Sequence, residues 1–378
     1  MMVVGVDPHK QSHTAVAADE LGRKKAQKTV RARRDGHREL IARAREIAPA
    51  GRLRAVEDVR HVAGGLIREL LAAGEQVVFV PPKLMAGERR GGRERGKSDP
   101  VDALAIARLA LREGAGLPAA RLDEQVLEVR RLTDYRDDLV AERTRFVNRL
   151  RWLVHDLDPE LAPPPRSLGS GRTRAKLEAG LRALPASAGQ RVALSQLARV
   201  TALSAEITGL EQDLAGLVTF LVPELLAIPG VAVITAAKII GEAGDIRRFR
   251  SPAAFARHNG TAPVPASSGT GTGGPQRLNR GGNRQLNAAL HRIAVVQARC
   301  HPGAGALLER RGQDKHETRK ASLRVLKRHL SDVIYRALNA DAWRLDQPAP
   351  HAASGFPSKR GHFDLTDRAC PRFVIAAM

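Results

Sequence analysis

The sequence predicts an α/β domain at the N-terminal end, a long helical arm, and a mostly α-helical second domain that includes a helix-hairpin-helix. Strand patterns alternate with helix patterns over the first 115 residues. A coiled-coil repeat follows, and helix patterns with glycine-rich loops fill most of the rest. The predicted boundaries are residues 1–118, 119–222 and 223–340, with 341–378 as a disordered tail.

Five strands and three helices make up the predicted α/β domain. Apolar stretches bounded by turn residues predict the strands, at residues 3–7, 13–18, 28–33, 53–57 and 76–80. Apolar residues at helical spacing predict one helix capped by Asp35 and two more at residues 61–73 and 100–112. Three antiparallel strands followed by α/β crossovers are the strand order of the ribonuclease-H-like fold.

Four carboxylates occupy the places where this fold brings side chains together. Asp7 and Glu57 end the first and fourth strands, which are neighbours in such a sheet. Asp99 and Asp102 begin the last helix and, three residues apart, share one helix face. Carboxylate oxygens suit Mg²⁺, and two ions about 4 Å apart can assist phosphodiester cleavage. The sequence therefore predicts a magnesium site for two ions, with Mn²⁺ as the alternative.

Each of these acids also has a structural explanation. Asp99 suits the N-cap of its helix, Pro100 the first helical position, and Asp102 the positive end of the helix dipole. Asp7 and Glu57 could be ordinary polar strand ends. The functional interpretation depends on the four acids occurring together.

The composition indicates a polyanionic partner. The net charge is +22 and the pI about 11.1, with basic residues in every segment, so nucleic acid is the simplest partner. Only 3% of the residues are aromatic, which argues against base stacking as the main binding mode. No zinc spacing surrounds Cys300 or Cys370, and neither a signal peptide nor an apolar run of about 18 residues is evident. We expect a soluble cytoplasmic protein with no membrane contact.

The middle of the chain predicts two long helices. The first covers residues 122–157, a Pro/Gly/Arg linker follows at 159–173, and the second contains leucine and isoleucine at alternating gaps of four and three. The residues of this seam are Leu203, Ile207, Leu210, Leu214, Leu217 and Leu221. We interpret the pair as an antiparallel arm or dimerisation element, with a hairpin packed inside one domain as the alternative.

The second domain contains several candidate nucleic-acid contacts. The turn Pro229-Gly230 precedes a helix at residues 232–243, as in a helix-hairpin-helix whose amides hold a phosphate, although a plain helical hairpin is similar. Helices are predicted at about 285–298 and 317–338. Lys97, at the end of a basic, glycine-rich stretch in the first domain, is a further expected contact.

Serine and glycine are interleaved at Ser267-Ser268-Gly269, a composition that usually marks a flexible loop. A functional interpretation is that glycine permits close approach to a phosphate while a hydroxyl attacks it. Arg277, Arg280 and Arg284 would then stabilise the developing charge.

Several motifs together resemble a known family. GVDPHK, AVEDVRH, VPPKLMAG and GKSDPVDALAIARLA are similar to the catalytic domain of the DEDD-type insertion-sequence transposases, which include the pilin-gene-inverting recombinases. The stretch from IPGVAVITAAKIIGEAGDIRRFRSPAAFARHNGTAPVPASSG to RLNRGGNRQLNAALHRIA is similar to their second domain. The resemblance covers residues 3–340 in the same order.

The resemblance implies that the four carboxylates bind Mg²⁺ and that a serine of the second domain forms a covalent phosphoserine link with DNA. It places that serine directly before glycine, at Ser268 rather than Ser267. It further implies double-stranded donor and target DNA, a structured guide ("bridge") RNA, and a homo-oligomer, dimer or tetramer, in which one subunit's serine meets another's acids.

The sequence departs from the family at one point. Many members follow the second acid with Thr/Ser-Gly, whereas Asp58 follows Glu57 here and competes for its role, although strand parity favours Glu57. Two other functions stay open: a structure-selective nuclease that uses water, and a non-catalytic nucleic-acid-binding protein. His9, His13 and His61 lack metal-ligand spacing and are interpreted as surface or supporting residues.

Overall fold

The computed structural model describes residues 2–49, 51–57, 60–81, 85, 98–121, 123–265, 276–277, 281–315 and 318–347. They belong to two compact units. The first consists of Met1–Asp123 with Arg247–Arg250, and the second of Glu124–Ile246 with Ser251–Met378. The predicted arm and the predicted second domain therefore lie in one compact unit.

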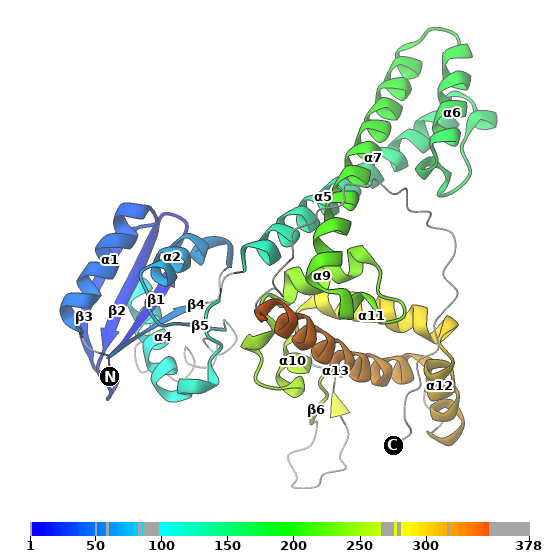
Figure 1. The fold of residues 1–378 in the computed structure, drawn as a ribbon. Helices are drawn as coiled ribbons and strands as arrows, with labels where there is room; N and C mark the ends of the chain where they lie inside the picture. The colour runs from blue at the N-terminus through cyan, green and yellow to red at the C-terminus, as the bar shows by residue number, and fades with distance from the viewer. Residues whose placement is uncertain are drawn as a thin grey trace, which may run out of the picture. The chain divides into compact units, whose positions relative to one another are not determined.

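The first unit is a five-stranded sheet with helices on both faces (Figure 1). Its elements are β1 (Met2–Pro8), β2 (Ser12–Ala18), β3 (Lys24–Arg31), α1 (Arg34–Ile47), β4 (Arg52–Glu57), α2 (Arg60–Ala72), β5 (Val77–Val80) and α4 (Asp99–Glu113). The strand order is β3-β2-β1-β4-β5. β2 is antiparallel to β1 and β3, and β4 is parallel to β1 and β5. This confirms the predicted order, with β1 in mid-sheet and β4 beside it.

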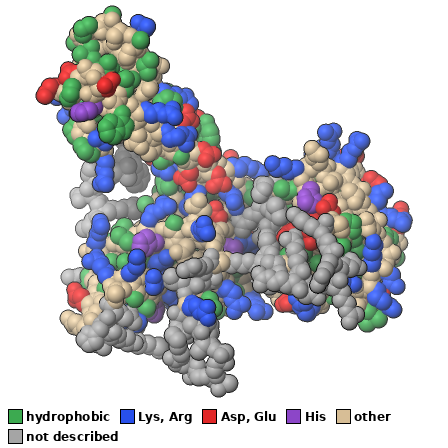
Figure 2. Space-filling model, turned by 180° about the vertical axis from the view of Figure 1, so that it is seen from behind, with side chains coloured by type: hydrophobic (Ala, Val, Ile, Leu, Met, Phe, Trp, Pro, Cys, Tyr) green, Lys and Arg blue, Asp and Glu red, His purple; other side chains and the backbone are tan. Residues whose placement is uncertain are grey.

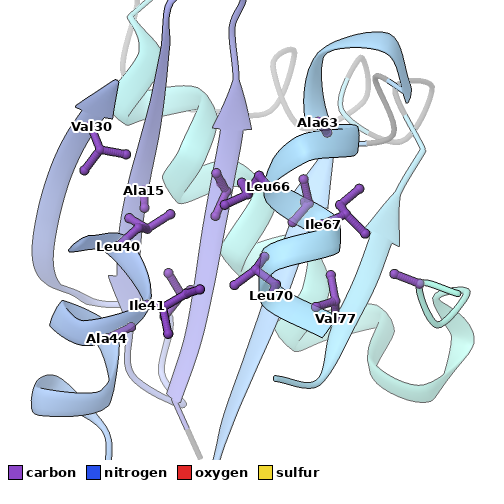
Figure 3. Packing of buried hydrophobic residues seen from close by; sticks show 14 of the residues in the cluster. Ala15, Val30, Leu40, Ile41, Ala44, Ala63, Leu66, Ile67, Leu70 and Val77 are labelled. Carbon is purple, nitrogen blue, oxygen red and sulfur yellow. The ribbon is translucent and has the colours of Figure 1, made fainter. Parts of the chain in front are cut away.

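Alternation along the strands divides the core between the two faces. Val4 and Val6 of β1 pack in the cluster beneath α1 and α2, whose buried side chains are drawn in Figure 3. Val3 belongs instead to the cluster beneath α4, together with Ala55 of β4. The sheet is therefore buried on both sides, and α4 covers one face alone.

Two local predictions need correction in this unit. β3 begins at Lys24, four residues before the predicted start, because Asp19 accepts hydrogen bonds from the Leu21 and Arg23 amides and closes a tight turn. The N-cap of α1 is Arg33, without a side-chain cap, so the cap predicted at Asp35 is wrong. Asp35 lies in the first turn, where a negative charge still favours the helix dipole.

The second unit is almost entirely helical (Figure 1). Its helices are α5 (Glu124–Leu157), α6 (Gly171–Ala183), α7 (Ala188–Leu221), α8 (Pro223–Leu226), α9 (Val233–Ala243), α10 (Pro252–His258), α11 (Arg284–Cys300), α12 (Pro302–Lys315) and α13 (Arg319–Asp346). Two short strands, β6 (Val264–Pro265) and β7 (Gln276–Arg277), pair with each other. Neither α6 nor α12 was predicted. Among the described residues, no helix is long and apolar enough to cross a membrane.

The arm is an antiparallel hairpin of α5 and α7. Arg136 is paired with Glu211 while Glu142 is paired with Arg199, so one helix runs forward as the other runs back. Leu203 and Ile207 of the predicted seam are buried against Leu139 of α5 within the same chain. This is the packing of the alternative interpretation, and a role of the arm in dimerisation stays a prediction.

The C-terminal helix extends past the predicted start of the tail. α13 continues to Asp346, and Asp341 is only 1% exposed. Its carboxylate accepts hydrogen bonds from the amides of Glu224 and Leu225, in the first turn of α8. Residues 341–346 are therefore part of the fold, and the prediction that they are disordered is wrong.

Candidate metal centre

Asp7 and Glu57 lie at the same edge of the sheet. β1 and β4 are parallel and pair Val6 with Val56, so the two acids are the next residue on each strand. Both belong to the α4 side by alternation, and they are 5% and 8% exposed respectively. The structure thus places Glu57 in the strand as predicted, whereas Asp58 lies outside the described residues.

Gly5 brings α4 onto β1. A Cβ atom at this position would lie 2.5 Å from the Ala107 amide nitrogen and closer still to the Ala103 carbonyl oxygen. The direction of α4 follows from Arg108, whose Nε donates to the Gly22 carbonyl at the opposite end of the sheet, 3.0 Å away. The helix therefore begins at the sheet edge that carries Asp7.

The first turn of α4 supplies the other two acids. Ser98 is the N-cap and Asp99 the first helical residue, so the predicted N-cap at Asp99 is one position late. Ser98 takes that position because its extended backbone lets its carbonyl accept from the amides of Val101 and Asp102. Asp102 is 6% exposed, whereas Asp99 is exposed.

His9 joins two of the acids and was missed as a site residue. Its Nε2 lies 3.1 Å from Oδ2 of Asp7 and 3.4 Å from Oδ1 of Asp99. Ligand atoms of Asp7, His9 and Asp99 all fall within 4.8 Å of one another. The available signal was its position two residues after Asp7, on the same side of the extended chain. Its contact with Asp99 depends on the placement of α4.

The electrostatics of the cluster favour a cation. Burial raises the pKa of Asp7, the neighbouring His9 lowers it, and repulsion from Asp102 and Asp99 raises it again. Grouping carboxylates at a buried edge is unfavourable unless positive charge is placed among them. Carboxylate oxygens are the donors that Mg²⁺ and Mn²⁺ prefer, and an imidazole is compatible with Mn²⁺. The residues present therefore fit a divalent metal.

The remaining predicted contacts belong to the second unit or lie outside the described residues. Ser267, Ser268, Lys97 and Arg280 are outside them. Arg277 of β7 and Arg284 at the start of α11 are both exposed.

The Pro229-Gly230 turn is built as a sharp turn against α11. Gly230 has a φ of +84°, and the Pro229 carbonyl accepts from Nε2 of Gln297 at 2.7 Å. A Cβ on Gly230 would be 3.2 Å from the Val296 side chain. The helix before the turn, α8, has only four residues. Phosphate binding at this turn stays a prediction.

Comparison with known proteins decides the family. A transposase model matches residues 4–159, and the model of the transposase IS116/IS110/IS902 family matches 222–309. The uncharacterized 44.8 kDa protein of insertion element IS116 from Streptomyces clavuligerus is 30% identical over 92% of this chain and 96% of that protein. The chain belongs to the IS116/IS110/IS902 transposase family.

Other relatives agree with this assignment. The uncharacterized 42 kDa protein of insertion element IS900 from Mycobacterium paratuberculosis is 27% identical to this transposase over 89% of the chain and 96% of that protein. The solved structure of Thermus thermophilus RuvC covers 32% of this chain and 100% of its own at 18% identity and a TM-score of 0.26. The fold assignment rests on the strand order described above.

Proposed function

We propose that this transposase cuts and rejoins double-stranded DNA with metal-bound carboxylates and a serine nucleophile. The observation that carries the proposal is the convergence of Asp7, Glu57 and Asp102 at one sheet edge, with Asp99 joined to Asp7 through His9. Bound Mg²⁺ would neutralise charge on the scissile phosphate and on the leaving oxygen. The four carboxylates would hold it, and His9 would orient Asp7 and Asp99.

In the proposed reaction the hydroxyl oxygen of Ser268 bonds to the scissile phosphorus. The bond from phosphorus to the leaving oxygen of the DNA strand breaks, and that oxygen gains a proton. A hydroxyl of the partner strand then attacks the phosphoserine, and Ser268 recovers its hydrogen. The energy of the phosphodiester is conserved, so rejoining needs no ATP. Arg277, Arg280 and Arg284 would stabilise the phosphorane charge, and Lys97 and Gly230 would contact the backbone.

The partners belong to the same proposal. Donor and target DNA would be selected by pairing with a structured guide RNA, and two or four copies of the chain would assemble on them. The family membership and the net charge of +22 support a nucleic-acid partner.

Two single substitutions test the chemistry in one recombination assay. Asp7→Ala and Ser268→Ala should each abolish exchange, and Ser268→Ala should remove the protein–DNA adduct seen on a denaturing gel. Ser267→Ala is the matched control for the serine and should keep the adduct. Asp58→Ala should likewise keep activity that Glu57→Ala loses.

The outcomes separate the competing functions. Undiminished cutting by Ser268→Ala would mean that water is the nucleophile and the protein a nuclease. Full function of Asp7→Ala would remove the metal centre from the mechanism and leave a nucleic-acid-binding protein.

A further inference from the structure

A pocket of the second unit is formed by two helix faces with the same spacing. α13 contributes Lys320, Leu323, Arg324 and Lys327, at positions i, i+3, i+4 and i+7. α11 contributes residues at the same spacing, namely Arg284, Asn287, Ala288 and His291. The pocket has a volume of about 550 Å³, within the roughly 300–1,000 Å³ of pockets that hold small molecules or parts of larger ones. We refer to it as the α11–α13 pocket.

One wall of the α11–α13 pocket is fixed by close backbone contact. Gly260 and Gly282 meet there, and a Cβ on Gly282 would overlap the backbone of Gly260. The fully buried Asn259 beside them donates to Ser331 and accepts from the Thr261 amide, at 2.8 and 3.0 Å. This wall is therefore rigid, and no side chain from its glycines fills the pocket.

The described lining of the pocket is basic. It carries Arg284, Lys320, Arg324 and Lys327 with His291 and no acidic side chain. None of the five forms an ion pair with an acid in the part of the chain that the structure describes. Lys327 is half-buried and its Nζ donates to Oδ1 of Asn287 at 2.5 Å.

The basic side chains of the pocket disfavour one another's charge. Burial lowers the pKa of Lys327, and the nearby Arg324 lowers it further. The pKa of His291 is lowered by burial and then by Lys327. An anion in the pocket would relieve this repulsion.

We infer that the α11–α13 pocket binds the phosphodiester backbone of a nucleic-acid strand. Two facing rows of cations suit a chain of phosphates, because each phosphate reaches donors from both helices and the exposed heads of Lys320 and Arg324 remain free to follow the strand. The contact positions the strand and reads no bases. The inference adds His291, Lys320, Arg324 and Lys327 to the surface of the proposed function, but it does not depend on cutting or on Ser268.

The inference is tested by the salt dependence of binding. Lys320→Gln combined with Arg324→Gln is compared with Arg292→Gln combined with Arg336→Gln, two exposed residues of the same two helices outside the pocket. Both double variants remove two positive charges. Fluorescence anisotropy is measured against labelled duplex DNA, single-stranded DNA and single-stranded RNA of one sequence.

The pocket variant should lower the slope of log K against log salt concentration by about 1.8 for duplex DNA or about 1.4 for a single strand. At 0.1 M salt this corresponds to a loss of affinity of roughly 25- to 60-fold. The polymer that shows the loss identifies the strand that the pocket holds. An equal loss in the control variant, or a loss on none of the three polymers, would overturn the inference.

Two further measurements exclude trivial explanations. Lys320→Arg combined with Arg324→Lys keeps the charge and should keep the slope, and circular dichroism shows whether each variant is folded. Asp7→Asn should bind with the wild-type slope even if it no longer cuts. Failure of the metal chemistry and failure of the pocket are therefore distinguishable.

Discussion

Gly5 sets the distance between β1 and α4, and with it the position of Asp102 beside Asp7. Because backbone atoms of Ala103 and Ala107 occupy the place of a Cβ, Gly5→Ala cannot be accommodated by a change of rotamer. We expect Gly5→Ala to lower the free energy of unfolding by about 3 kcal/mol, at the upper end of overpacking, and to weaken Mg²⁺ binding. Thermal unfolding with and without Mg²⁺ measures both effects.

Gly64 in α2 is the matched control for Gly5. Nothing lies within 4 Å of a Cβ built on it, and it sits inside a helix. Gly64→Ala should therefore stabilise the protein by about 0.5–1 kcal/mol. If Gly5→Ala were as stable as Gly64→Ala, the close packing of α4 on β1 would be wrong.

His13 and His37 form a buried pair whose protonation opposes folding. Their Nε2 atoms are 3.2 Å apart, and burial together with the charges of His37 and His9 lowers the pKa of His13 to about 4. Between pH 6.5 and 4 the unfolded chain binds a proton that the folded chain does not. Stability should therefore fall as the pH drops through this window, by about 3 kcal/mol in total.

Urea unfolding at several pH values measures the effect of this pair. The double variant His13→Leu, His37→Leu should lose the part of the pH dependence between pH 6.5 and 4, because it has no imidazole to protonate. His329→Gln, at an exposed position of α13, should keep it. A double variant with the wild-type pH dependence would assign the acid sensitivity to other groups.

α13 and α8 are held together by a single buried carboxylate. Asp341 supplies the acceptor for two amides at the start of α8, and its replacement leaves both donors without it. We expect Asp341→Ala to cost about 2 kcal/mol of unfolding free energy, as for the loss of a buried helix cap. Arg336→Ala, on an exposed turn of the same helix, should cost less than about 0.5 kcal/mol. Equal costs would contradict the capping role.

The sequence predicted those elements whose patterns are local. Strand ends follow from runs such as Val3 to Val6, and the order of strands and helices then placed Asp7 beside Glu57. α6 was missed because only Leu177 and Leu181 of its thirteen residues are buried, so its apolar periodicity is weak. His9 and Asp341 were missed for another reason. Their partners are distant in sequence, and only tertiary packing brings them together.

The charge of the whole molecule is spread over both units. Figure 2 shows Lys and Arg side chains over the visible face of each, more numerous than the acidic ones. Against this background the acids at the edge of the sheet are a local exception, as expected where cations lie between protein and phosphate. The proposed chemistry requires them to act together with Ser268, which belongs to the other unit.

Mixing two inactive variants tests whether the acids and the serine act across subunits. If one subunit's acids serve another's serine, a dimer of Asp7→Asn with Ser268→Ala keeps one site in which both partners are wild type. Co-expressed variants should then form roughly a quarter of the wild-type protein–DNA adduct, because half of randomly assorted dimers are mixed. Asp7→Asn mixed with Asp102→Asn should form none, since every site lacks a carboxylate. No adduct in the first mixture, with mixed dimers demonstrated by differently tagged subunits, would place acids and serine within one subunit.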